Sequence, residues 1–233
     1  MIHVVATAQE AQKTDMKGAT AVVIDVLRAT STMTVAVHNG ANGIVAVKSP
    51  DEAFRLKSLY PEGSVLLGGE RHADKIEGFD LDNSPLSYTS NVVCGKTIVM
   101  TTTNGTLAID ACKSVDRLFI SSFLNVNSVV NKLKSVVGDV YVVCAGTEGR
   151  FTIEDGLCAG YIVNALEGEK SDLAIALQEV YVSYSDDISR VVAKGEHFSR
   201  LIRKGYGCDL DVCFSDIRDY DALEYVNGVI TKS

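Results

Sequence analysis

The chain contains no tryptophan, only 3 prolines and fewer basic than acidic residues, with 22 Lys and Arg against 30 Asp and Glu. Its net charge is −8 and its calculated pI about 5.0. A chain this acidic lacks the broad basic surface that nucleic acid or an anionic membrane requires, so neither is an expected partner. Three prolines are too few for a stiff hinge segment between domains.

Long hydrophobic runs and paired cysteine motifs are also missing. The longest stretch without Asp, Glu, Lys or Arg, residues 29–47, contains His38, Asn39, Asn42 and several hydroxyl residues, which a membrane-spanning helix would not carry together. The first four residues have no basic region, so no signal peptide is expected. None of the six cysteines has CxxC or zinc-like spacing, and we interpret them as reduced residues, mostly of the core, in a cytoplasmic protein: Cys94, Cys112, Cys144, Cys158, Cys208 and Cys213.

Short runs rich in Val and Ile alternate with helical patterns along most of the chain. The predicted strands are Ile2–Thr7, Thr20–Val26, Gly43–Val47, Ser64–Leu67, Lys96–Met100, Arg117–Ser121 and Asp139–Cys144. Helices are expected from near Ala29, after the capping box Ser49–Glu52, and over residues 125–137 and 153–166. The alternation predicts an α/β protein with a largely parallel sheet.

The pattern changes after Ser171. Helical stretches dominate residues 172–204, and a final weak strand is expected near Val226–Ile230. We expect one α/β domain over residues 1–233, with residues 172–207 as a candidate helical subdomain or lid.

Four predicted strands are followed by loops rich in glycine, hydroxyl groups, carboxylates or arginine. These loops are residues 25–32, 68–72, 101–106 and 145–150, the last followed by Glu154 and Asp155. Because ligands bind beyond the carboxyl ends of strands in open parallel sheets, the four loops are expected to meet around one cleft.

Each candidate residue has a structural interpretation beside the functional one. Asp25 is a helix N-cap, a metal ligand or a nucleophile. Arg28 forms a salt bridge to Asp25 or holds an anion through its planar guanidinium. The Asn104-Gly105 turn either binds an anion at the following helix or is an ordinary turn.

Glu154 and Asp155 are favoured in the first turn of any helix, but together with Asp25 and Glu70 they resemble oxygen ligands for Mg²⁺. His38 and His72 are interpreted as surface or core residues. No GxGxxG or GxSxG motif is present, which argues against a dinucleotide fold and a serine hydrolase. The residues alone thus predict an anion pocket for a small phosphorylated acid, with Mg²⁺.

Five motifs in order resemble the 2-phosphosulfolactate phosphatase family: DVLRATST at 25–32, GGER at 68–71, GFDLDNSP at 78–85, TTTNGT at 101–106 and EDGLCAG at 154–160. Asp82 stands where the family usually has glycine. The resemblance implies a three-layer α/β/α fold, with a parallel or mixed sheet. It also implies Mg²⁺-dependent hydrolysis of 2-phospho-3-sulfolactate to 3-sulfolactate and phosphate, a step toward coenzyme M.

These arguments give a set of expected roles. Asp25, Arg28 and Glu154 are expected to be catalytic, and the expected Mg²⁺ ligands are Asp25, Glu70, Glu154 and Asp155. The expected substrate-binding residues are Arg28, Arg71, Thr103, Asn104 and Arg150, with Arg28 toward the phosphoryl group and Arg71 toward the sulfonate or carboxylate. A phosphatase for another small phospho-acid and a non-catalytic anion-binding module stay as alternatives, and a homodimer stays open.

Overall fold

The computed structural model describes residues 1–215 and 219–233. Within them, ten strands form one mixed sheet in the order β1-β8-β2-β7-β9-β10-β3-β6-β4-β5. The strands are β1 (Ile2–Val5), β2 (Thr20–Ile24), β3 (Gly43–Ala46), β4 (Val65–Arg71), β5 (Asp74–Lys75), β6 (Thr97–Thr101), β7 (Arg117–Ser121), β8 (Val140–Cys144), β9 (Leu223–Val226) and β10 (Val229–Lys232). All seven predicted strands are present, and the predicted α/β class is confirmed.

Helices connect most of the parallel strands. They are α1 (Ala8–Ala11), α2 (Ala29–His38), α3 (Pro50–Lys57), α4 (Ser90–Val93), α5 (Gly105–Ala111), α6 (Val126–Leu133), α7 (Ile153–Ala165), α8 (Asp172–Tyr184), α9 (Ser189–Val192), α10 (Glu196–Arg203) and α11 (Gly207–Cys213), with a 3₁₀ turn at Pro85–Ser87. The predicted N-cap Ser49 is confirmed, since the Glu52 N–H donates to Ser49 Oγ at 3.2 Å, while the Glu52 carboxylate accepts the N–H of Lys48 at 3.0 Å. No helix within the described ranges is long and apolar enough to span a membrane.

Successive side chains of a strand point to opposite faces of the sheet, so each buried strand packs against a helical layer on either side. In β2, Val22 and Ile24 face an apolar cluster that includes α6, α7 and α8. Ala21 and Val23 face a second cluster that includes α1 and α5. Because all five residues of β2 are buried, both faces of the sheet are covered, as expected of parallel strands in an α/β protein.

The final strand predicted near Val226–Ile230 is found as two strands, because these residues contain the turn of the hairpin β9–β10. Asn227 and Gly228 have φ values of 52° and 92°, the left-handed region that a tight hairpin turn requires. The hairpin β9–β10 lies inside the sheet, antiparallel to β7 on one side and to β3 on the other. An Asn-Gly pair between apolar residues is a turn signal that the sequence carried.

The second correction concerns residues 68–71, which were predicted to form a loop and instead extend β4. Gly69 has a φ of 146°, and a Cβ there would lie 2.0 Å from the Thr101 carbonyl oxygen of β6. Glycine thus allows β4 to run beside β6 through residues that carry little strand propensity. The extension brings Glu70 and Arg71 to the end of the strand.

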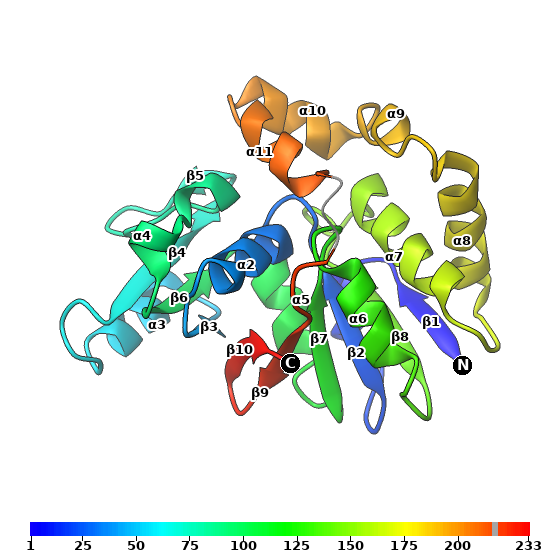
Figure 1. The fold of residues 1–233 in the computed structure, drawn as a ribbon, viewed down its shortest axis with the longest axis horizontal. Coiled ribbons are helices and arrows are strands. Elements are labelled where there is room, and N and C mark those ends of the chain that lie inside the picture. Colours follow the sequence, from blue (N-terminus) through cyan, green and yellow to red (C-terminus); the bar gives the residue numbers. More distant parts are fainter. Residues whose placement is uncertain (216–218) are drawn as a thin grey trace.

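Residues 172–213 are mainly helical, as predicted, although α11 was not expected. Helix α8 packs against α7 of the central domain. Helices α9, α10 and α11 then arch over the carboxyl ends of the strands, above the loops that follow β2, β4 and β8 (Figure 1). This placement makes the C-terminal segment the roof of the region in which the polar loops meet.

Candidate active site

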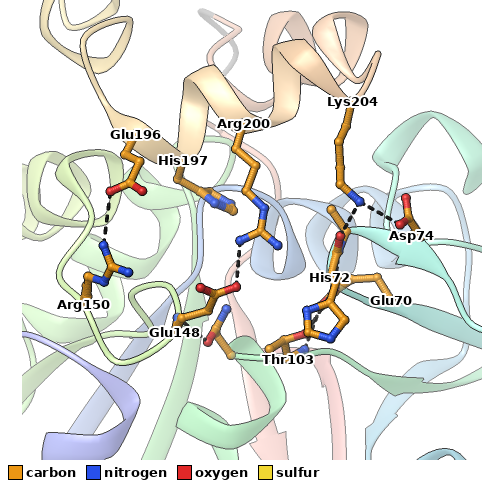
Figure 2. Close-up of polar contacts among 12 residues, drawn as sticks. Glu70, His72, Asp74, Thr103, Glu148, Arg150, Glu196, His197, Arg200 and Lys204 are labelled. Atoms are coloured by element: carbon orange, nitrogen blue, oxygen red, sulfur yellow. Dashed lines mark hydrogen bonds and ion pairs between the residues drawn. The ribbon is translucent and has the colours of Figure 1, made fainter.

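The four polar loops line one cleft at the carboxyl edge of the sheet, as predicted. The cleft has a cavity volume of about 30 Å³, and its polar lining is Asp25, Arg28, Glu70, His72, Asn83, Thr103, Asn104, Thr147, Glu148, His197 and Arg200. All of these residues lie at the carboxyl ends of strands β2, β4, β6 and β8 or in the loops that follow them, except Asn83 and the two residues of α10. Figure 2 shows His197 and Arg200 descending from α10 toward Glu148, with Glu70, His72 and Thr103 at the opposite side.

Asp25 lies at the base of this cleft and is 8% exposed. Its Oδ1 accepts the Ala29 N–H at 3.2 Å, the first amide of α2, but the N-cap of that helix is Arg28, so the N-cap interpretation of Asp25 is wrong. Its Oδ2 faces Gly105, where a Cβ would lie 2.7 Å from that oxygen. The pKa of Asp25 is raised well above its usual value, mainly by burial and then by the charges of Asp155 and Glu70.

Glu70 is held by three donors in the same cleft. The Ala73 N–H donates to its Oε2 and the Thr103 N–H to its Oε1, both at 2.7 Å, and the Thr103 hydroxyl donates to Oε2 at 3.2 Å. These bonds fix the carboxylate between the end of β4 and the loop after β6. Asp25 and Glu70 therefore face one cavity with their positions fixed by backbone donors.

Asp155 does not line the cleft but braces the loops behind it. It accepts the Val26 N–H at 2.9 Å and the Gly146 N–H at 3.0 Å, which joins the ends of β2 and β8. Burial raises its pKa to about 6, against the lowering effect of these two bonds. Its role as a Mg²⁺ ligand stays a prediction, and its observed contacts are those of a brace.

Glu154 is 1% exposed and lines a second cavity that adjoins the cleft. Its Oε2 has no hydrogen-bond partner in the described part of the chain. Burial first, and then the Asp155 charge, raise its pKa to about 8. The catalytic and metal-binding roles expected of Glu154 stay predictions. Glu154 is not part of the cleft lining, whereas His197 and Arg200 line both cavities.

Arg28 forms a buried ion pair, but its partner is Asp209 of α11 and not Asp25. Nη1 lies 2.6 Å from Asp209 Oδ2, and Nη2 donates to the Ala73 carbonyl at 3.0 Å. The guanidinium also stacks on the Tyr206 ring, with its carbon 4.0 Å from the centroid. The guanidinium of Arg28 thus lines the cleft while tying the C-terminal segment to it.

The other two predicted arginines lie outside the cleft. Arg71 donates to the carbonyls of Glu70 and Lys48 and to the Thr101 hydroxyl, and it lines a separate hollow beside α5. Arg150 is largely exposed, 3.5 Å from Glu196, at the second cavity. Asn104 does line the cleft, and its Oδ1 accepts the Glu148 N–H at 3.2 Å.

Two residues of α10 complete the site and were not predicted from the sequence. Arg200 Nη1 lies 2.8 Å from Glu148 Oε1, and His197 Nε2 lies 2.7 Å from the Leu27 carbonyl oxygen. Lys204, one turn further, contacts Asp74 and the His72 carbonyl (Figure 2). The spacing of His197, Arg200 and Lys204 places them on one helix face, which is the signal that the sequence offered.

The donor set fits a magnesium ion that takes part of its coordination from water or substrate. No three His, Cys, Asp or Glu side chains within residues 1–215 and 219–233 are arranged to hold a metal by themselves. Mg²⁺ usually binds one or two carboxylates together with waters and phosphate oxygens. The pKa of Asp25 is raised first by burial and then by repulsion from Asp155 and Glu70, and a divalent cation between Asp25 and Glu70 would offset both effects.

Comparison with known proteins agrees with this geometry. The family model described as 2-phosphosulpholactate phosphatase matches residues 5–226. A protein of Caldicellulosiruptor saccharolyticus is 44% identical over 228 residues, covering 93% of both chains. One from Thermotoga maritima is 44% identical over 211 residues, covering 90% of both, and one from Clostridium novyi is 40% identical over 223 residues, covering 94% of both. All three are named probable 2-phosphosulfolactate phosphatases. The chain therefore belongs to the 2-phosphosulpholactate phosphatase family, whose name is that of a phosphoric monoester hydrolase.

Proposed function

We propose that this protein is a Mg²⁺-dependent phosphatase that hydrolyses 2-phospho-3-sulfolactate to 3-sulfolactate and phosphate. The observation that carries the proposal is the convergence of Asp25 and Glu70, two buried carboxylates, on one cleft that also receives Arg28 and Arg200. Carboxylates with a divalent cation, and guanidinium groups beside them, are the usual means of binding a phosphoryl group. The family and the names of its relatives supply the substrate.

Mg²⁺ bound at Asp25 and Glu70 would neutralise phosphoryl charge and thereby make attack at phosphorus easier. Glu70 contributes a carboxylate that Ala73 and Thr103 hold in place. Asp25 contributes the oxygen that faces Gly105, as a metal ligand or as the nucleophile. Arg200 lies on the roof of the cleft, where it offers positive charge to the anionic groups of the substrate.

The roof also keeps water away from the reacting groups. Contacts of α10 to the loops after β2, β4 and β8 close the cleft from above: His197 to Leu27, Lys204 to Asp74 and Arg200 to Glu148. A water-poor cleft strengthens the attraction between the substrate's charges and the fixed groups around it.

Release of inorganic phosphate tests this proposal. The expected result is Mg²⁺-dependent release from 2-phospho-3-sulfolactate, with slower release from 2-phospholactate and phosphoglycolate. A higher kcat/KM for one of the other two esters would assign the protein to another phospho-acid. Binding of the esters without any release would instead indicate a non-catalytic anion-binding module.

We also propose that the protein acts in the cytoplasm. None of the six cysteines forms a disulfide, which agrees with a reducing cytoplasm. Sulfolactate formed there would be available for a pathway of the coenzyme M type.

A further inference from the structure

The segment GFDLDNSP at residues 78–85 runs between β4 and α2, beside the cleft. Leu81 forms a parallel bridge to Gly68 of β4. Two residues further, the Asn83 carbonyl accepts the Thr32 hydroxyl of α2 at 2.9 Å. Asn83 is thereby held between the strand that carries one carboxylate of the cleft and the helix that follows the other.

The backbone on both sides of Asn83 is fixed by hydrogen bonds. The Asp82 carboxylate accepts the Ser84 N–H at 3.0 Å and the Ser87 hydroxyl at 2.8 Å. The Ser84 hydroxyl donates to Asp209 of α11. These contacts tie the neighbours of Asn83 to the 3₁₀ turn and to the roof, so its side chain enters the cleft from a fixed position.

The side chain of Asn83 carries an orphaned acceptor. It is 4% exposed and lines the cleft together with Asp25 and Glu70. Its Oδ1 is buried and has no hydrogen-bond partner within residues 1–215 and 219–233. Arg28 lines the same cleft but pairs with Asp209 instead. A buried acceptor without a partner is unfavourable, so Oδ1 indicates a bound group that these residues do not supply.

The oxygens around Oδ1 favour a cation as that group. Asp25 and Glu70 bring two carboxylates to the same cleft, and carboxylate and amide oxygens both suit Mg²⁺ and Mn²⁺. Two carboxylates already balance the charge of a divalent ion. A neutral amide therefore adds a ligand without adding a negative charge that would repel a phosphoryl group.

We propose that Asn83 is a third protein ligand of the metal ion at Asp25 and Glu70, through its Oδ1. Its neutrality leaves the ion able to attract the anionic substrate. The inference rests on the proposed function for the presence of a divalent ion at the two carboxylates, and it adds a ligand that the acidic residues alone do not reveal.

Binding of Mn²⁺ alone tests the ligand, because the electron paramagnetic resonance signal reports the free ion. Asn83→Leu removes the amide oxygen at similar side-chain size, and the dissociation constant of Mn²⁺ should rise at least about tenfold. Asn131→Leu, at an exposed position of α6, is the control and should bind like the wild type. Equal dissociation constants for Asn83→Leu and the wild type would overturn the inference and leave the proposed function standing. No binding of Mn²⁺ by the wild type would overturn both.

Thermal unfolding separates a metal ligand from a structural residue. Since leucine removes an unpartnered buried acceptor, Asn83→Leu in EDTA should melt no lower than the wild type. Added Mn²⁺ should raise the melting temperature of the wild type and raise that of Asn83→Leu less. A lower melting temperature in EDTA, or failure of the variant to fold, would assign Asn83 a structural role and overturn the inference.

Asn83→Asp tests the importance of a neutral ligand. Aspartate keeps an oxygen at this position, so Mn²⁺ should bind at least as tightly as in the wild type. The added charge should weaken binding of inorganic phosphate in the presence of Mg²⁺, measured by calorimetry, by about tenfold or more. Weaker Mn²⁺ binding by Asn83→Asp would overturn Oδ1 as a ligand, and unchanged phosphate binding would contradict the role of its neutrality.

Discussion

The guanidinium of Arg28 and the carboxylate of Asp209 form an ion pair at 2.6 Å in which both side chains are at most 3% exposed. The pair joins the loop after β2 to α11, across 181 residues of sequence. Ser84 donates to the other Asp209 oxygen, so Asp209 connects three separate segments around the cleft. The roof is therefore fixed to the site by a buried charge pair and not only by exposed contacts.

Removing one member of this pair should be strongly destabilising. Asp209→Asn leaves the Arg28 charge buried without its counter-ion, and we expect the free energy of unfolding to fall by about 3–5 kcal/mol. Urea denaturation measures this change. Asp221→Asn, which breaks the exposed pair with Lys232, is the control and should lower stability by less than about 1 kcal/mol. Similar losses in the two variants would contradict the account of Asp209.

Glu154 should make the metal-free protein less stable as pH rises. Its pKa is about 8 in the folded chain against its usual 4.5, so the folded state holds the proton more tightly. The resulting stabilisation is complete below about pH 4.5 and is lost as pH rises toward 8. Glu154→Gln should remove this decline and be more stable than the wild type at pH 8.5 by roughly 2–4 kcal/mol.

Urea midpoints measured in EDTA at several pH values test this prediction. Glu167→Gln changes an exposed glutamate just after α7 and should follow the wild-type curve. Parallel pH curves for Glu154→Gln and the wild type would show that Glu154 ionises normally in the folded protein.

Arg200 should contribute to substrate binding although the sequence did not single it out. Arg200→Ala removes a cation from the cleft, and we expect KM for 2-phospho-3-sulfolactate to rise about 10- to 100-fold. Arg203→Ala alters an exposed arginine on the same helix, and its KM should stay near the wild-type value. Steady-state kinetics of the two variants decide this, and a KM for Arg200→Ala within twofold of the wild type would exclude the role.

Two of the three predicted anion-binding arginines, Arg28 and Arg71, should respond differently to replacement by lysine. Arg28→Lys loses the planar contacts to Asp209, the Ala73 carbonyl and Tyr206, and we expect kcat/KM to fall by about 10- to 1000-fold. Arg71→Lys alters a hollow outside the cleft, and its kcat/KM should change by less than about threefold. A large loss of kcat/KM in Arg71→Lys would show that Arg71 contributes to the substrate site, as the sequence predicts.

The sequence predicted the site best where the chain is locally regular. Strand runs followed by polar loops were enough to bring Asp25, Glu70, Thr103 and Asn104 to one edge, because parallel strands align their carboxyl ends. The partner of Arg28 was not predictable in this way. Asp209 belongs to a helix far along the chain, and only tertiary packing places it beside Arg28.

Side-chain direction was the other limit. Arg71 follows the site residue Glu70 in sequence, but adjacent residues of an extended strand point to opposite faces. The Glu70 side chain therefore lines the cleft, whereas the Arg71 side chain lines the separate hollow beside α5. Treating residues 68–71 as a loop concealed this alternation. The Asn227-Gly228 turn is a different case, because the sequence did contain its turn signal. The predicted terminal strand nevertheless included these two residues.

The rate of phosphate release from 2-phospho-3-sulfolactate, measured after EDTA treatment and during stepwise return of Mg²⁺, tests the central claim most directly. The account predicts no release in EDTA and a saturable recovery with Mg²⁺, because buried carboxylates at Asp25 and Glu70 would otherwise repel the anionic substrate. It also predicts that Asp25→Asn recovers less than about a thousandth of the wild-type rate, whereas Asp186→Asn, an exposed control, recovers fully. Full activity in EDTA, or wild-type recovery by Asp25→Asn, would contradict it.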